Sequence, residues 1–159
     1  MTIDLDELAA FLVEAKKRTY AGLDDDASVA SPLLEGSKQL DYQAGRFAYR
    51  DIYFGMGYFV GQETVSRETR VIWSMSYHGG IRPDLSDRGL IVAVYAFLRK
   101  ALLRVDVDRP YRGPASFAVD DLSYRNESEG DLARFVGAET VFQSGRVVYD
   151  LRYGGGLLK

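Results

Sequence analysis

The sequence predicts an α+β domain in which a helix followed by a three- or four-stranded antiparallel unit occurs twice. Three observations support this fold class. The length of 159 residues is typical of one domain, the chain aligns with itself, and a helical pattern precedes each aligned segment. We therefore expect a single domain, residues 1–159, with internal repeats of about 1–81 and 82–159. A pseudo-two-fold axis should relate the repeats, with a twisted sheet packed on two helices.

The internal repeat is the strongest of these observations. Residues 59–80, FVGQETVSRETRVIWSMSYHGG, align with residues 135–156, FVGAETVFQSGRVVYDLRYGGG, and 11 of the 22 aligned positions are identical. Ordinary amino-acid usage would give roughly one or two identities by chance. The sequence thus indicates a duplication.

Two helices are expected from apolar periodicity. The first spans about 4–19, with acidic residues in its first turn and basic residues in its last, the order that the helix dipole favours. The second spans about 86–104, with Ser86 as a candidate cap. Because the stretch 90–98 is apolar on nearly every face, we expect this helix to be the more deeply buried, with Leu98 in the core.

Strands follow each helix in the same order. Alternating patterns and turn residues predict strands at 39–43, 46–54, 58–67 and 70–78, and then at 115–119, 122–127, 134–143 and 146–153. Between the first helix and the first strand, residues 21–38 form one long irregular stretch. A connection of this length is either a lid or disordered.

Composition excludes several classes of function. The net charge of −3 argues against direct binding of nucleic acid, which usually needs a basic surplus. The chain has no cysteine, which excludes disulfides, thiolate nucleophiles and cysteine metal sites. The first residues are acidic and no long apolar run follows, so we expect no membrane association and a cytoplasmic location. Phosphate-binding and hydrolase motifs are missing, and we expect no cofactor, no bound metal and no catalytic residue.

Glu63 and Glu139 occupy the same place in the two repeats, within Gly-x-Glu-Thr-Val. Two carboxylates brought together across a cleft could bind a cation or divide acid and base roles. The alternative, which we favour, is that each glutamate anchors its strand through Arg50 or Arg125, or through backbone donors. Matching sequence frames predict matching environments for the two glutamates.

Aromatic residues and one arginine complete the candidate ligand-binding set. Tyrosine offers an apolar ring and a hydroxyl, which suits a pocket for a partly polar ligand, but aromatic residues also simply favour strands. The loop 110–114, Pro-Tyr-Arg-Gly-Pro, fixes Arg112 either to clamp an anion or to pair inside the fold, and we favour internal pairing. The candidates are Glu63, Glu139, Arg112, Tyr49, Tyr53, Trp73, Tyr77 and Tyr124.

Two further features have simpler interpretations. Gly61 and Gly137 precede the paired glutamates, and glycine within a strand marks a bulge or a close approach by another segment; we favour the bulge. His78 is the only histidine and lies outside the repeated pattern, so we expect a surface residue rather than a metal ligand or a triad member.

The order of these segments resembles an uncharacterised bacterial family, a domain of unknown function found alone or attached C-terminally to Cro/repressor-type helix-turn-helix regulators. The resemblance rests on Thr19-Tyr20-Ala21, Tyr49-Arg50-Asp51, Gly61-Gln62-Glu63, Trp73-Ser74-Met75-Ser76-Tyr77, Pro110-Tyr111-Arg112-Gly113-Pro114 and Gly137-Ala138-Glu139. It implies a domain placed to sense a ligand or to mediate assembly, and it implies no activity or cofactor.

Three functions remain open on the sequence. The first is a non-catalytic domain with an aromatic-lined cleft for a small molecule or peptide. The second is a small enzyme that uses Glu63 or Glu139 as acid, base or metal ligand. The third is a structural module that forms a homodimer through an exposed sheet edge.

Overall fold

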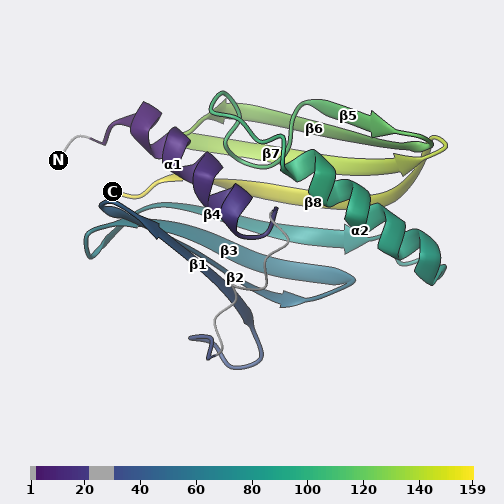
Figure 1. Ribbon diagram of the computed structural model, residues 1–159, viewed down its shortest axis with the longest axis horizontal. Coiled ribbons are helices and arrows are strands. Elements are labelled where there is room, and N and C mark those ends of the chain that lie inside the picture. Colours follow the sequence, from purple (N-terminus) through teal and green to yellow (C-terminus); the bar gives the residue numbers. More distant parts are fainter. Residues whose placement is uncertain (1–2, 22–30) are drawn as a thin grey trace.

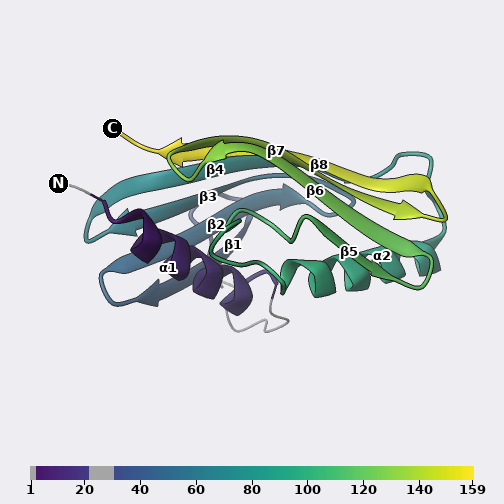
Figure 2. The same ribbon diagram turned by 90° about the horizontal axis from the view of Figure 1, so that it is seen from above.

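A computed structural model describes residues 3–21 and 31–159. Its main feature is one antiparallel sheet of eight strands, with both helices on the same face of that sheet (Figures 1 and 2). Neither described helix has the length and apolar content needed to cross a membrane. Residues 22–30, half of the irregular stretch 21–38 that was predicted to be a lid or disordered, lie outside the described residues.

The elements follow the chain in two series, each a helix and then four strands. The first series is α1 (Leu5–Arg18), β1 (Lys38–Ala44), β2 (Phe47–Gly55), β3 (Tyr58–Arg67) and β4 (Arg70–Ile81). The second is α2 (Arg88–Leu102), β5 (Ser116–Val119), β6 (Leu122–Asp131), β7 (Arg134–Gln143) and β8 (Arg146–Leu157). All ten expected elements are therefore present, within a few residues of their predicted bounds.

The strand order is β1-β2-β3-β4-β8-β7-β6-β5. Strands that are consecutive in each series form hairpins, and the two series meet where β4 pairs with β8. This central ladder runs from Trp73 opposite Leu157 to Ile81 opposite Tyr149. It makes the eight strands a single hydrogen-bonded sheet.

The predicted fold class, a duplicated helix-plus-strands unit of the α+β class, is wrong. The protein is dominated by its sheet, with 51% strand and 20% helix, and the strands do not form separate three- or four-stranded sheets packed on helices. The reason is the central ladder: β4 and β8 each keep a free edge after forming their hairpins, and pairing these edges satisfies the backbone hydrogen bonds of both.

The second helix was expected to be the more deeply buried of the two, and the structure does not show this. In α1 the buried residues form a continuous stripe that includes a lysine, Lys16. Helix α2 buries a stripe through Val94 and Leu98, but Val92 is 69% exposed, so the apolar stretch is not buried all round. Leu98 lies in the core as predicted. The helix is capped by Asp87, whose side chain accepts from the Leu90 N–H at 3.1 Å, rather than by Ser86.

The core lies between the helices and the facing side of the sheet. Strand alternation directs large aromatic rings to this side, where they stack on one another. For example, Phe135 packs against Trp73 with ring centroids 5.8 Å apart and against Tyr111 at 4.1 Å. We call the side of the sheet that faces the helices the inner face, and the opposite side the outer face.

Candidate functional site

Most of the predicted site residues lie on the inner face and are brought together there. Side chains point to this face from β2, β3 and β4 because the register sets Asp51 opposite Glu63 and Glu63 opposite Met75. The predicted residues that are buried in this way are Tyr49, Glu63, Trp73, Tyr77, Arg112, Tyr124 and Glu139, whereas Tyr53 is only partly buried. Together with Lys16, Tyr20, Asp51 and Tyr149, these buried residues form what we call the interior cluster.

Glu63 forms an ion pair with Lys16 of α1, and both side chains are fully buried. The ammonium group also lies near three aromatic rings, with its Nζ 5.4 Å from the ring centroid of Tyr20, 5.8 Å from that of Tyr49 and 5.9 Å from that of Trp73. Burial lowers the pKa of Lys16, and Glu63 opposes that shift. Lys16 is therefore held by one carboxylate and a cage of ring faces.

Glu139 has a richer set of partners. Its Oε1 accepts from Arg112 Nη2 at 2.5 Å and from the Tyr149 hydroxyl at 2.9 Å, and its Oε2 accepts from the Tyr124 hydroxyl at 2.7 Å. Burial acts to lower the pKa of Arg112, but the charge and hydrogen bond of Glu139, together with the nearby Tyr20 and Tyr149, outweigh it and the net pKa shift is upward. The predicted internal pairing of Arg112 is confirmed.

Asp51 lies beside these pairs, with its Oδ1 accepting from the Tyr77 hydroxyl at 2.7 Å. Burial, with the nearby charge of Glu63, raises the pKa of Asp51 from 3.8 to about 7. The two carboxylates are cross-strand neighbours, so ionising both in the interior is costly. One inner-face carboxyl group thus changes its protonation near neutral pH.

Glu63 and Glu139 were predicted to lie in matching environments, and this prediction is wrong. Glu63 pairs with a lysine from α1, and Glu139 with an arginine from the loop before β5. The expected partners were wrong as well, because Arg50 and Arg125 point to the outer face. Arg50 there binds Asp41 at 2.9 Å. Strand alternation could have shown this, since Arg50 lies between the inner-face residues Tyr49 and Asp51.

The bulges predicted at Gly61 and Gly137 lie elsewhere, at Val65/Ser66 and Val141/Phe142. Each glycine instead lies beneath a tyrosine ring of the neighbouring strand. A Cβ at Gly61 would fall 2.3 Å from the Tyr77 hydroxyl oxygen, and one at Gly137 would fall 2.1 Å from Tyr153 Cζ. The glycines therefore make room for a ring, the close approach that was the alternative interpretation.

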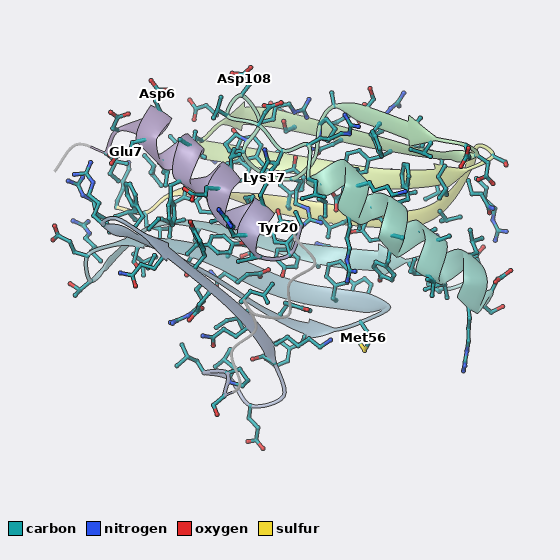
Figure 3. All side chains as sticks on the ribbon, viewed as in Figure 1. Asp6, Glu7, Lys17, Tyr20, Met56 and Asp108 are labelled. Carbon is teal, nitrogen blue, oxygen red and sulfur yellow. The ribbon has the colours of Figure 1, made fainter. Side chains whose placement is uncertain are left out.

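The interior cluster is packed rather than hollow. Three of its oxygen atoms, Tyr20 Oη, Tyr49 Oη and Glu63 Oε1, have no hydrogen-bond partner within the described residues, and all three are closed off from solvent. Figure 3 shows Tyr20 at the end of α1, over the middle of the sheet. Among the described residues no group of His, Asp and Glu side chains is arranged to hold a metal ion.

An open hollow of about 700 Å³ lies on the outer face, and we call it the outer groove. Its lining comes from β2, β3, β4 and β8 and from Leu34, which precedes β1. The lining residues are Leu34, Arg50, Ile52, Phe54, Val60, Gly61, Gln62, Thr64, Ser76, Tyr77, His78, Arg152, Tyr153 and Gly154. Two small residues, Ser76 of β4 and Gly154 of β8, lie opposite each other in its floor.

Two comparisons with known proteins returned nothing: no curated protein and no solved structure matches the chain. A family model described as "Domain of unknown function (DUF5680)" matches residues 51–158. The chain belongs to this family. The DUF5680 match includes Glu63, Arg112 and Glu139, whereas Lys16 and Tyr20 lie outside it. The description of DUF5680 assigns no activity.

The outer groove of this DUF5680 domain was not predicted from the sequence. Its residues are ordinary outward-facing positions of strands, and His78, expected on the surface, is indeed exposed there. One signal was available: three outward positions near the middle of β4 and β8 are small, namely Ser74 and Ser76 on β4 and Gly154 on β8. Small side chains on adjacent strands leave a depression where neighbouring strands carry large ones.

Proposed function

We propose that this DUF5680 domain is a non-catalytic binding domain that takes a small, largely apolar molecule in the outer groove. The observation that carries the proposal is the groove itself. A volume of about 700 Å³ lies within the range of small-molecule sites, which are mostly apolar with a few polar groups. Of the predicted aromatic residues, Tyr77 is among the lining residues, and Tyr49, Trp73 and Tyr124 support the site from behind as packed core.

The apolar lining is exposed in the absence of a ligand. Phe54 is 44% exposed, Val60 50% and Leu34 51%, and these side chains border one hollow rather than being scattered. An apolar solute that covers them would remove this surface from water, and burial of apolar surface contributes roughly 25 cal/mol per Å². Contiguous exposed apolar surface of this kind is typical of binding sites.

The rigid interior supports the proposal in a second way. The groove floor belongs to strands that are held on their inner faces, β3 by the Lys16–Glu63 pair and β8 by the hydrogen bond from the Tyr149 hydroxyl to Glu139. A floor held from behind keeps its shape when the groove is empty, which lowers the ordering cost of binding. In this proposal the interior cluster stabilises the fold, and the outer groove binds the ligand.

The resemblance to domains attached to helix-turn-helix regulators in bacteria supports a sensing role for such binding. In that role the ligand is a signal rather than a substrate, which agrees with a non-catalytic site. A cytoplasmic location and a homodimer formed through a sheet edge remain predictions.

The proposal can be tested by placing a large side chain in the groove. Ser76 is exposed on the groove floor, and we expect Ser76→Phe to abolish binding of the neutral apolar dye N-phenyl-1-naphthylamine, measured by its fluorescence. The matched control is Ser123→Phe, the same change at an exposed position of β6 outside the groove. Amide chemical shifts of the wild type should change at Gln62, Ser76 and Gly154 on dye addition. Dye binding that survives Ser76→Phe, or shifts confined to the helices, would refute the proposal.

A further inference from the structure

The outer groove has different chemistry at its two ends. Register places Phe54, Val60, His78 and Arg152 side by side across β2, β3, β4 and β8. The next row toward the middle of the sheet contains Ile52, Gln62, Ser76 and Gly154. The groove thus passes from apolar side chains over β2 to a cationic end over β8. Four strands at about 4.8 Å spacing give it a span of about 14 Å.

Arg152 is the group that distinguishes the cationic end. Its side chain is exposed, and none of the ion pairs among the described residues includes it. The carboxylate two residues away on the same face, Asp150, is bound by Arg82 at 2.8 Å. Arg50, the other arginine of the groove, is bound by Asp41. Among the described residues, the guanidinium of Arg152 is therefore the one in the groove that forms no ion pair with a carboxylate of the chain.

His78 lies opposite Arg152 in the register of the central ladder. Its Nδ1 lies 3.2 Å from the Tyr58 hydroxyl, which fixes the ring beside the cationic end. Gly154, next along β8 on the outer face, adds no side chain that would cover this end. An anionic group there meets a guanidinium and an imidazole, while its apolar part reaches toward Phe54 and Ile52.

We propose that the ligand of the outer groove is an amphipathic carboxylate, with its carboxylate at Arg152 and its apolar chain over Ile52, Phe54 and Val60. This inference rests on the proposed function and adds the chemical class and the orientation of the ligand. Arginine binds carboxylates through paired, charge-assisted hydrogen bonds, which give both affinity and direction. A ligand of one polarity only would satisfy just one end of the groove.

The test compares ligands that differ only in the head group. We expect decanoate to bind about tenfold more tightly than decan-1-ol, because only decanoate can form the charge-assisted bonds. Arg152→Gln should remove this preference, weakening decanoate about tenfold and leaving decan-1-ol unchanged. Calorimetric titration, with each compound kept below its aggregation limit, measures both affinities. The matched control is Arg125→Gln, at an exposed arginine of β6 on the outer face, and it should bind both compounds as the wild type does.

The outcomes separate this inference from the proposed function. Equal affinities for decanoate and decan-1-ol, both lost in Ser76→Phe, would overturn the carboxylate class and leave apolar binding in place. Failure of both compounds to bind the wild type would count against both proposals. A preference for decanoate that persists in Arg152→Gln would show that the anion lies elsewhere, and it would overturn the orientation.

Discussion

At the scale of single residues, the two buried glutamates differ in how completely they are bonded. Glu139 has three side-chain partners, whereas Glu63 has Lys16 on one oxygen and no partner within the described residues on the other. An unsatisfied buried acceptor costs stability, and a buried charge without its counter-charge costs more. Lys16 and Glu63 therefore depend on each other.

We expect Glu63→Gln to lower the free energy of unfolding by about 3–5 kcal/mol, because it leaves the buried Lys16 ammonium without a counter-charge. Adding Lys16→Met to this variant should recover part of the loss, since no uncompensated charge remains. Urea unfolding of the two single variants and the double variant measures the coupling. Strict additivity, or wild-type stability of Glu63→Gln, would contradict the mutual dependence of the pair.

The residues of the interior cluster could be predicted in part. Repetition of Gly-x-Glu-Thr-Val singled out both glutamates, and the two prolines around Arg112 indicated a fixed side chain. Lys16 escaped prediction because a lysine in the last turn of a helix normally interacts with the helix dipole at the surface. The signal that was available is its spacing, because Lys16 lies four residues after Leu12 and eight after Leu8, on the buried stripe of α1.

At the scale of elements, α2 shows how an apolar run can mislead. Its sequence is apolar on nearly every face, yet only the stripe through Val94, Leu98 and Ala101 is buried. The helix lies on one face of a sheet, so its far side meets water whatever its composition. An apolar run can thus predict a helix without predicting how much of it is buried.

We expect Leu98→Ala to cost about 2–5 kcal/mol, the range for truncating a buried leucine, because its side chain is 4% exposed. Val92→Ala, on the same helix, should change stability by less than about 0.5 kcal/mol because Val92 is 69% exposed. Thermal and urea unfolding of both variants provide the comparison. Similar losses at the two positions would show that α2 packs differently from this arrangement.

At the scale of the whole molecule, strand positions were predictable and their assembly was not. Alternation and turn residues located all eight strands. Repetition in a sequence, however, does not say whether two sets of strands remain apart or join edge to edge. The pairing of β4 with β8 is a long-range contact between segments that carry no complementary local signal, and it determines the sheet.

We expect the free energy of unfolding to depend on pH through the titration of Asp51. Its pKa rises from 3.8 to about 7 on folding, so between these values the folded protein holds a proton that the unfolded chain has released. Stability attributable to this group is therefore greatest at low pH and falls as pH rises toward 7. Above that value both states are ionised and the penalty is constant.

Asp51→Asn removes this titration and keeps an oxygen for the Tyr77 hydroxyl. We expect the unfolding free energy of the variant, relative to wild type, to increase between pH 4 and 7 and to level off above. Subtracting the two urea-unfolding profiles cancels the carboxyl groups that both proteins share. Glu129→Gln, at an exposed position of β6, is the control and should give a flat difference. A flat difference for Asp51→Asn as well would exclude the raised pKa.

The position of Trp73 gives the molecule a built-in optical reporter. It is the only tryptophan, it is fully buried on β4, and its indole stacks on Phe135 of β7 and donates to the Leu132 carbonyl at 3.2 Å. Residues so distant along the chain meet only when β4 and β8 have joined. The wavelength of its emission therefore reports the assembly of the core around the central ladder, including the docking of Lys16 of α1, which during refolding must wait for the slow search that contacts of large sequence separation require.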